Sequence, residues 1–231
     1  MLVYGRNVVV ELLKSKKNIK KVILQENFSE KEINSLLEKS KFKVEMKSKR
    51  EMDRLCNANH QGIIVDIADY QYNSMSDITE KDHFIVILDH LEDPHNLGAI
   101  IRTSEAAGVD AIIIPKDRQV QVNSTVMKTS AGALTNMKVI SVSNIVNAMD
   151  KLKKVGFWMV GTALEDSIDY REIDYQGKIA LVIGNEGRGI SSIVRKSCDF
   201  VAKIPMYGKI NSLNASVASG IMIYEVVRNR K

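Results

Sequence analysis

The sequence predicts an α/β protein in two parts, a small N-terminal α/β sandwich and a larger C-terminal domain built on a parallel sheet. Short apolar runs alternate with amphipathic segments along the chain, which is the pattern of strands and helices that cover one another. Residues 71–82 hold few aliphatic side chains and show no period, so we expect them to form a linker. The predicted domains are therefore 1–70 and 83–231.

The first 70 residues alternate between helix and strand patterns. Val8, Val9, Leu12 and Leu13 recur at helical spacing. Residues 29–32 have the Ser-x-x-Glu pattern of a capping box, which predicts the start of a second helix. The expected elements are helices over 5–13, from residue 29 and over 50–55, and strands over 22–24, 42–46 and 62–67.

Beyond the linker the pattern changes to strands that are buried on both faces. Residues 84–88 are apolar at every position, as expected for a strand inside a parallel sheet covered by helices. Gly108 is a stop signal for the helix that follows. The expected strands are 84–88, 111–114, 138–140, 157–160, 178–184 and 200–204, and the expected helices are 97–107, 122–129, 145–155, 191–196 and one that begins at residue 212.

The last helix is preceded by a loop that Pro205 and Gly208 break. Its apolar residues recur at helical spacing and predict a face directed to the core. Ser, Asn and Ser lie close together at its start, where free backbone N–H groups form an anion site; these types are also ordinary helix caps. The apolar residues are Leu213, Val217, Ile221, Tyr224 and Val227, and the polar ones are Ser212, Asn214 and Ser216.

The positive charge is concentrated near the N-terminus. Residues 1–69 hold 14 Lys and Arg against 10 Asp and Glu, whereas residues 70–231 hold 19 against 18, and the net charge is +5. This excess favours an anionic partner such as nucleic acid. A solvated loop accounts for any single lysine, but their concentration predicts an RNA-facing edge with Asn7 and loop 57–62. The candidate RNA-binding residues are Arg6, Lys16, Lys17, Lys20 and Lys21.

Several classes of protein are disfavoured. Cys56 and Cys198 are isolated, so neither a disulfide framework nor a cysteine-based metal site is expected. His90 and His95 lie beside two carboxylates, but their loop has no helical register, and we predict no metal site. No signal peptide or run of about 18 apolar residues occurs, and we expect a soluble cytoplasmic protein without a membrane partner.

Three polar loops are predicted to leave the carboxyl ends of parallel strands, where ligands of such sheets bind. Neither the dinucleotide-binding nor the P-loop glycine pattern occurs. The three loops resemble, in order and spacing, the signature motifs of the SpoU (TrmH) branch of the SPOUT RNA methyltransferases. They read Asn96-x-Gly98-x-x-x-Arg102, Gly184-Asn-Glu186-Gly-x-Gly189 and Ser212-Leu-Asn214-x-Ser216.

The resemblance covers residues 84–228 and extends to the family's small RNA-binding domain at the N-terminus. It is closest to the 23S rRNA guanosine-2′-O-methyltransferases. It implies S-adenosylmethionine as methyl donor, a trefoil knot in the C-terminal domain, and a homodimer packed through the knot. The implied donor-binding residues are Thr162, Ala163, Gly184, Ile204, Met206 and Leu213.

The resemblance also implies the catalytic set. The family assigns the role of base to the arginine of its first motif, here Arg102. A guanidinium is effectively never deprotonated, so Arg102 acts either as a strongly perturbed base or as a clamp that holds a phosphate and polarises the ribose hydroxyl. Asn96, Glu186, Ser212 and Asn214 then orient Arg102 and the nucleotide.

Two other functions stay open at this point. A tRNA ribose 2′-O-methyltransferase would use the same motifs, although tRNA members of the branch usually lack the extra N-terminal domain. A non-catalytic RNA-binding or ribosome-assembly factor would use the same fold without turnover. The presence of all five polar residues favours the enzyme, with ribosomal RNA as substrate.

Overall fold

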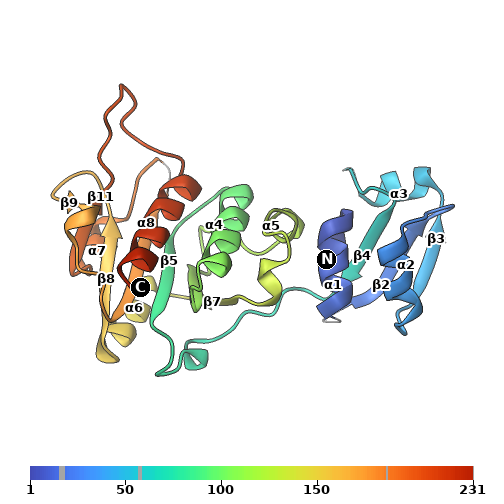
Figure 1. Ribbon diagram of the computed structural model, residues 1–231, viewed down its shortest axis with the longest axis horizontal. Coiled ribbons are helices and arrows are strands. Elements are labelled where there is room, and N and C mark those ends of the chain that lie inside the picture. The colour runs from blue at the N-terminus through green and yellow to red at the C-terminus, as the bar shows by residue number, and fades with distance from the viewer. Residues whose placement is uncertain (16–18, 57–58, 186, 231) are drawn as a thin grey trace. The chain divides into compact units, whose positions relative to one another are not determined.

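The computed structural model describes residues 1–15, 19–56, 59–185 and 187–230 (Figure 1). The chain forms two compact units, which are described separately below. The N-terminal unit consists of Met1–Gln71 with Val122–Asn136, and the C-terminal unit of Tyr72–Gln121 with Met137–Lys231. The sequence-based domains were continuous segments, whereas these contacts join residues 122–136 to the first 71 residues.

The N-terminal unit is built on a mixed four-stranded sheet of order β1-β4-β2-β3, in which β2 and β3 are parallel. Strand β1, which has three residues, was not predicted because so short a segment shows no period. The elements are β1 (Leu2–Tyr4), α1 (Arg6–Ser15), β2 (Ile19–Gln25), α2 (Lys31–Glu38), β3 (Val44–Lys47), α3 (Lys49–Leu55) and β4 (Ile63–Ile67).

Helices cover both faces of this sheet, as the predicted sandwich requires. On one face Met52 of α3 packs against Ile23 and Ile64. Side chains alternate along a strand, so the neighbours of these residues point to the opposite face, on the side of α1 and α2. Helix α5 (Ser124–Thr129) and the short turn η2 (Ala133–Thr135) complete the unit, with the Lys128 ammonium 5.2 Å from the Tyr4 ring centroid.

The expected capping box at the start of α2 is wrong. The helix begins at Lys31, and its N-cap is Glu30, whose carboxylate accepts the Ile33 N–H at 2.7 Å. This start places Glu32 second in the helix, one position short of where a capping-box glutamate must lie. The unit has a capping box at α3 instead, where Ser48 and Glu51 exchange hydrogen bonds.

The C-terminal unit contains a seven-stranded sheet of order β7-β6-β5-β10-β8-β11-β9, and every pair in it is parallel. The predicted fold class is thereby confirmed. The elements are η1 (Met75–Asp77), β5 (Phe84–Asp89), α4 (Pro94–Ala106), β6 (Ala111–Pro115), β7 (Lys138–Val142), α6 (Ile145–Lys154), β8 (Phe157–Thr162), β9 (Ile168–Asp169), η3 (Tyr170–Glu172), β10 (Lys178–Gly184), α7 (Ser192–Lys196), β11 (Phe200–Lys203) and α8 (Ala215–Asn229).

Two helices cover each face of this sheet. Met149 of α6 and Val194 of α7 share one core with Ile85 and Ile87 of the central strand β5. On the opposite face α4 and α8 contact each other, and they lie side by side in green and red in Figure 1. The strands are therefore buried on both sides, which explains their continuous apolar runs.

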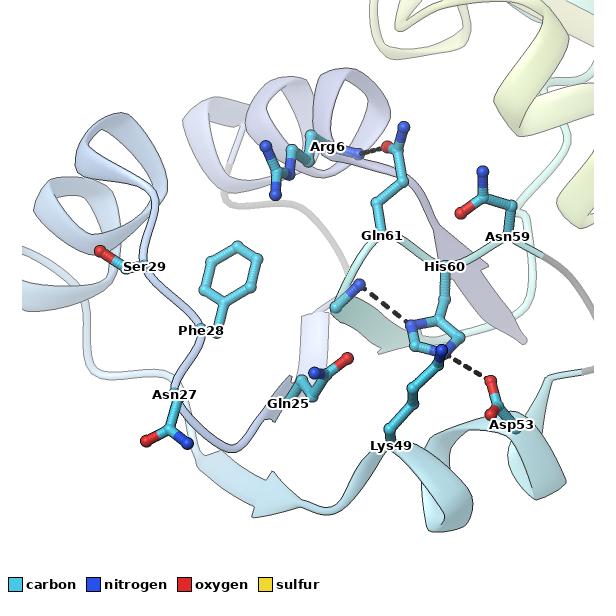
Figure 2. A pocket seen from close by; sticks show the side chains of 11 residues that line it. Arg6, Gln25, Asn27, Phe28, Ser29, Lys49, Asp53, Asn59, His60 and Gln61 are labelled. Atoms are coloured by element: carbon cyan, nitrogen blue, oxygen red, sulfur yellow. Dashed lines mark hydrogen bonds and ion pairs between the residues drawn. The ribbon is translucent and has the colours of Figure 1, made fainter.

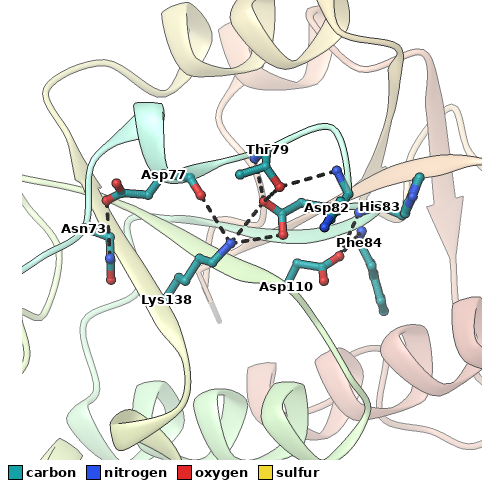
Figure 3. A network of polar contacts seen from close by, with 9 residues as sticks. Asn73, Asp77, Thr79, Asp82, His83, Phe84, Asp110 and Lys138 are labelled. Carbon is teal, nitrogen blue, oxygen red and sulfur yellow. Dashed lines mark hydrogen bonds and ion pairs between the residues drawn. The ribbon is translucent and has the colours of Figure 1, made fainter.

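The segment before β5 is attached to the edge strand β7. Asn73 forms a parallel bridge with Ile140, and Lys138 contacts both Asp82, at 3.0 Å, and the Asp77 carbonyl, at 3.2 Å (Figure 3). Burial by itself raises the pKa of Asp82, but hydrogen bonds from the Thr79 N–H and from Lys138 outweigh it, and the net pKa is lowered. Much of the segment 71–82 that was expected to be a linker is thus folded onto the sheet.

The prediction for α8 was wrong in its start and in its buried face. The helix begins at Ala215, and Val217 and Tyr224 are each 52% exposed. The buried face instead carries Ser219, Met222 and Ile223. Because α8 has apolar residues on more than one side, its sequence period could not show which side packs on the sheet.

Candidate functional site

A pocket of about 530 Å³ lies at the carboxyl ends of three neighbouring strands, β10, β8 and β11. This is the edge of a parallel sheet at which ligands bind. All of its lining residues belong to the C-terminal unit. The pocket is lined by Thr162–Glu165, Ile183–Asn185, Gly187–Ile190, Arg195, Ala202–Ile204, Met206, Asn211–Leu213, Ala215 and Ala218.

One wall is bare backbone at the end of β10. A Cβ on Gly184 would lie 2.0 Å from the Gly189 carbonyl carbon and 2.2 Å from the Ile190 nitrogen, so only glycine fits. Asn185 and Gly189 close the loop through two backbone hydrogen bonds, of 3.1 and 2.9 Å. Gly184, Gly187 and Gly189 all line the pocket, so this wall has no side chain at three positions.

The loop after β8 forms the second wall. The Thr162 hydroxyl donates to the Val182 carbonyl at 3.2 Å, and the Ala163 N–H donates to the Ala202 carbonyl at 3.0 Å. Arg195 donates to the Glu165 carbonyl and to the Asp166 carboxylate, at 2.6 and 2.8 Å. Bonds from both neighbouring strands thus fix the predicted residues Thr162 and Ala163.

The third wall is the loop between β11 and α8. Ile204, Met206 and Leu213, which the resemblance implies as donor-binding residues, line the pocket, and so does Ser212, which it implies as a catalytic residue. Asn214 lies just beyond them as the N-cap of α8, and its side-chain oxygen accepts the Ser216 N–H at 2.9 Å. Ser212 and Asn214 therefore precede the helix. The sequence had predicted that they lie inside its first turn.

Two predicted catalytic residues lie on α4, outside the lining of this pocket. The N-cap of α4 is Asp93 with Pro94 after it, so Asn96 is not a cap but a helix residue that is 6% exposed. Arg102 is exposed, and no hydrogen bond or ion pair of its side chain occurs among the described residues. Its guanidinium is thus accessible to an anionic ligand.

The candidate RNA-binding residues have different surroundings. Arg6 and Lys20 are exposed, whereas Lys21 forms an ion pair of 3.1 Å with Glu45 and, through that hydrogen bond, lowers the pKa of the glutamate. Lys16 and Lys17, like Glu186 of the second motif, lie outside the residues that the structure describes.

Sequence reasoning missed part of the lining. Leu164, Glu165, Arg188, Arg195 and Asn211 face the pocket but were not predicted. The rule that ligands bind after parallel strands would have indicated the first two, because they directly follow β8. Arg195 lies on α7, and nothing in the local sequence distinguishes it from an ordinary surface arginine.

Two other features, a metal site and a membrane-spanning helix, are not found among the described residues. Among the described residues no group of three or more His, Cys, Asp or Glu side chains could hold a metal ion. Within the same ranges, no helix has the length and apolar character that crossing a membrane requires.

Residues 83–224 match the model of the SpoU rRNA Methylase family. The chain belongs to the SpoU methylase family. Residues 2–73 of this SpoU protein also match the model described as RNA 2′-O ribose methyltransferase substrate binding. Both parts of the predicted resemblance are confirmed at the level of the family.

Individual relatives agree with this assignment. A TrmH family tRNA/rRNA methyltransferase of Staphylococcus epidermidis is 42% identical over 239 aligned positions, covering 100% of this chain and 96% of its own. The AdoMet-bound rRNA methyltransferase of Sinorhizobium meliloti superposes with a TM-score of 0.85 at 26% identity, over 98% of this chain and 86% of its own. A TrmH/SpoU tRNA modifying enzyme of A. aeolicus has a TM-score of 0.59 at 34% identity, over 64% and 76%.

This SpoU protein is therefore an RNA methyltransferase, and its methyl donor is S-adenosylmethionine. The pocket fits that donor. Its volume is within the range of small-molecule sites, and its glycine wall leaves main-chain groups accessible. When bound, S-adenosylmethionine supplies an electrophilic methyl group on a sulfonium.

Proposed function

We propose that this SpoU protein methylates the 2′-hydroxyl of a guanosine ribose in 23S rRNA. The observation that carries the proposal is the pocket at the carboxyl edge of the sheet, which brings Thr162, Ala163, Gly184, Ile204, Met206 and Leu213 together from three separate loops. A shared pocket is what a common role in binding the donor requires.

The adenosine part of the donor is proposed to lie against the backbone of Gly184, Ile204 and Leu213. Adenine presents ring nitrogens and an amino group, which main-chain N–H and C=O groups can pair with in a fixed geometry. Thr162 is held by the Val182 carbonyl, and this bond fixes the wall opposite the glycine loop.

Methyl transfer forms an O–C bond, breaks an S–C bond and releases the hydroxyl proton. Arg102 is proposed to hold the neighbouring phosphate and polarise this hydroxyl, because its guanidinium is exposed and makes no bond within the described residues. The alternative is a literal base, which needs a strongly perturbed guanidinium. Asn96, Glu186, Ser212 and Asn214 are proposed to orient the nucleotide.

Ribosomal RNA is proposed as substrate over tRNA because of the extent of the structural matches. The rRNA methyltransferase of Sinorhizobium meliloti aligns with 98% of this chain, whereas the tRNA modifying enzyme of A. aeolicus aligns with 64%. The choice of guanosine as the nucleoside and of 23S rRNA as the molecule rests on the resemblance to the 23S rRNA guanosine-2′-O-methyltransferases. The RNA-binding residues are proposed to be Arg6, Lys16, Lys17, Lys20 and Lys21.

We further propose a cytoplasmic homodimer packed through a knotted C-terminal region. The exposed apolar side of α8, with Val217 and Tyr224, supports this packing. Trp158 and Phe200, whose ring centroids are 5.9 Å apart, are also exposed and by strand alternation point to the sheet face that carries α8. Light scattering of the Tyr224→Asp variant should then show monomers, and an unchanged mass would contradict this packing.

The deciding experiment maps ribose methylation in RNA from cells that lack or carry the protein. The expected result is one 2′-O-methylguanosine in 23S rRNA that disappears with the protein and returns when purified protein and S-adenosylmethionine are added. If a methyl group is lost only from tRNA, the substrate is tRNA and not rRNA. RNA binding without any methyl transfer would favour the non-catalytic assembly factor.

A further inference from the structure

The N-terminal unit contains a second pocket, of about 810 Å³, whose lining includes Arg6 and residues 59–62 of the predicted RNA-facing edge. All of its lining residues belong to this one unit. Figure 2 shows their side chains around a common space. They come from the start of α1, the end of β2 and the turn after it, α3 and the loop before β4, and they are Arg6, Gln25, Asn27–Ser29, Lys49, Asp53 and Asn59–Gly62.

The back of this pocket is fixed by His60, which is 4% exposed. Its Nδ1 accepts the Gly62 N–H at 3.0 Å, and its Nε2 lies 3.0 Å from an Asp53 carboxylate oxygen. Both ring nitrogens and the single carboxylate of the pocket are therefore engaged within the protein. This arrangement leaves His60 and Asp53 as supports of the loop and provides no set of ligands for a metal ion.

An aromatic ring forms one side of the pocket. Gly62 has a φ of +81°, and a Cβ there would lie 2.9 Å from a carbon of the Phe28 ring, so the ring packs against bare backbone. The Arg6 guanidinium lies 5.8 Å from the centroid of the same ring. The Arg6 N–H also donates to the Gln61 side-chain oxygen at 2.8 Å, which joins the start of α1 to the loop before β4.

The remaining lining is rich in carboxamides. Gln25, Asn27, Asn59 and Gln61 each carry an acceptor and an NH₂ donor, and Lys49 adds a cation. This chemistry matches a nucleobase, which has a flat face for a ring or guanidinium and an edge of mixed donors and acceptors. A paired base has both faces stacked and its edge occupied, so only an unpaired one can enter.

We propose that this pocket binds one unpaired nucleotide of the RNA substrate, with its base against Phe28 and Arg6 and its edge on the carboxamides. The inference rests on the proposed function and extends it. This pocket belongs to the N-terminal unit, whereas the proposed donor pocket belongs to the C-terminal unit. Substrate choice would then depend on a single-stranded feature of the RNA as well as on the methylated position.

The test measures binding of full-length variants to a ten-nucleotide single-stranded RNA of mixed sequence and to a fully paired RNA duplex of the same length. Phe28→Leu should weaken single-strand binding about tenfold and leave duplex binding near wild type, because a stacked base loses its platform. Phe42→Leu, at another half-buried phenylalanine of the same unit, is the matched control. Arg6→Gln with Arg54→Gln as control repeats the comparison at exposed positions.

Equal affinities for Phe28→Leu and Phe42→Leu, or an equal loss on both RNAs, would overturn the inference. So would the absence of any photocrosslink inside the pocket when 4-thiouridine is placed at each position of the single strand in turn. Methyl transfer to rRNA is measured on the same variants. If the wild type methylates no RNA, the proposed function fails while the binding comparison still decides the pocket; if it methylates rRNA and Phe28→Leu binds and reacts as well, only the pocket inference fails.

Discussion

The two pockets of this protein differ in the atoms that line them. In the C-terminal unit the wall at Gly184 is main chain, and two backbone hydrogen bonds between Asn185 and Gly189 close its loop. In the N-terminal unit the lining includes an aromatic ring, an arginine and four carboxamides, which come from loops, from the end of β2 and from the start of α1. Main-chain walls suit a ligand that never changes, such as a methyl donor, whereas side chains can change between relatives that bind different RNA sequences.

The two regions should therefore respond to different substitutions. Changes at the carboxyl edge of the parallel sheet should affect donor binding or chemistry, and changes in the N-terminal unit should affect RNA affinity alone. Each of the following predictions tests whether donor binding and chemistry respond separately from RNA affinity.

The largest expected effect is on chemistry. Arg102→Ala should lower the rate of methyl transfer by about 10²–10⁴, because the hydroxyl loses the group that polarises it or takes its proton. Arg102→Lys should also fail, since a point charge cannot reproduce a bidentate fork. Donor affinity, measured by calorimetry, should stay near wild type in both variants and in the control Lys151→Ala, an exposed cation on α6. Full activity of Arg102→Ala would reject the proposed role.

The next effect is on donor binding. Gly184→Ala should weaken S-adenosylmethionine by at least about tenfold, because a Cβ there meets the Gly189 and Ile190 backbone and must displace the loop. Gly208→Ala is the control, since no atom would lie within 4 Å of its Cβ and Gly208 is outside the lining of the pocket. Circular dichroism checks that both variants fold. Equal donor affinities for the two would mean that the pocket is not the donor site.

A smaller effect concerns the salt dependence of RNA binding. Lys20→Glu should reduce the slope of log affinity against log salt by about 0.7–0.9, as expected for one lost phosphate contact. Lys21→Glu should reduce this slope by less, because Lys21 already pairs with Glu45. The repulsion between the new glutamate and Glu45 should also disturb the pairing of their two strands. Donor affinity should not change in either variant. An unchanged slope for Lys20→Glu would mean that Lys20 does not contact a phosphate of the RNA.

The smallest effect is on stability. Asp82→Asn should lower the free energy of unfolding of the C-terminal unit by about 1–3 kcal/mol, because Lys138 and the Thr79 N–H lose a charged acceptor. Although burial acts to raise the pKa of Asp82, hydrogen bonds from the Thr79 N–H and from Lys138 hold this pKa below its ordinary value. Its contribution is therefore complete above the unfolded pKa and is lost as the pH falls through the folded pKa.

Thermal unfolding of the wild type and Asp82→Asn at pH 7 and near pH 3 measures this difference. The two melting temperatures should converge at the lower pH. A difference of the same size at both pH values would mean that the substitution acts through packing and not through charge. Affinity for the donor and for RNA should be unaffected at pH 7, which tests that the attachment of residues 72–82 to β7 serves neither pocket.

The sequence by itself determined most helices and strands, because their hydrophobic periods are local and strong. It also determined the family, since three motifs at fixed spacing cannot match by accident of composition. The family implies Gly184 and Leu213 as donor-binding residues; both line the pocket at the carboxyl edge of the sheet, and their role there is a prediction. The roles of the catalytic residues are still a prediction.

The tertiary structure alone decided which face of α8 is buried, because the helix has apolar residues on both sides and only contact with α4 and the sheet selects one. It also decided that Lys21 is paired with Glu45, on a neighbouring strand, and that residues 122–136 pack with the first unit. The pocket around Phe28 was likewise decided by the tertiary structure alone. Its lining is brought together from four parts of the chain that carry no shared motif, so only long-range packing could create it.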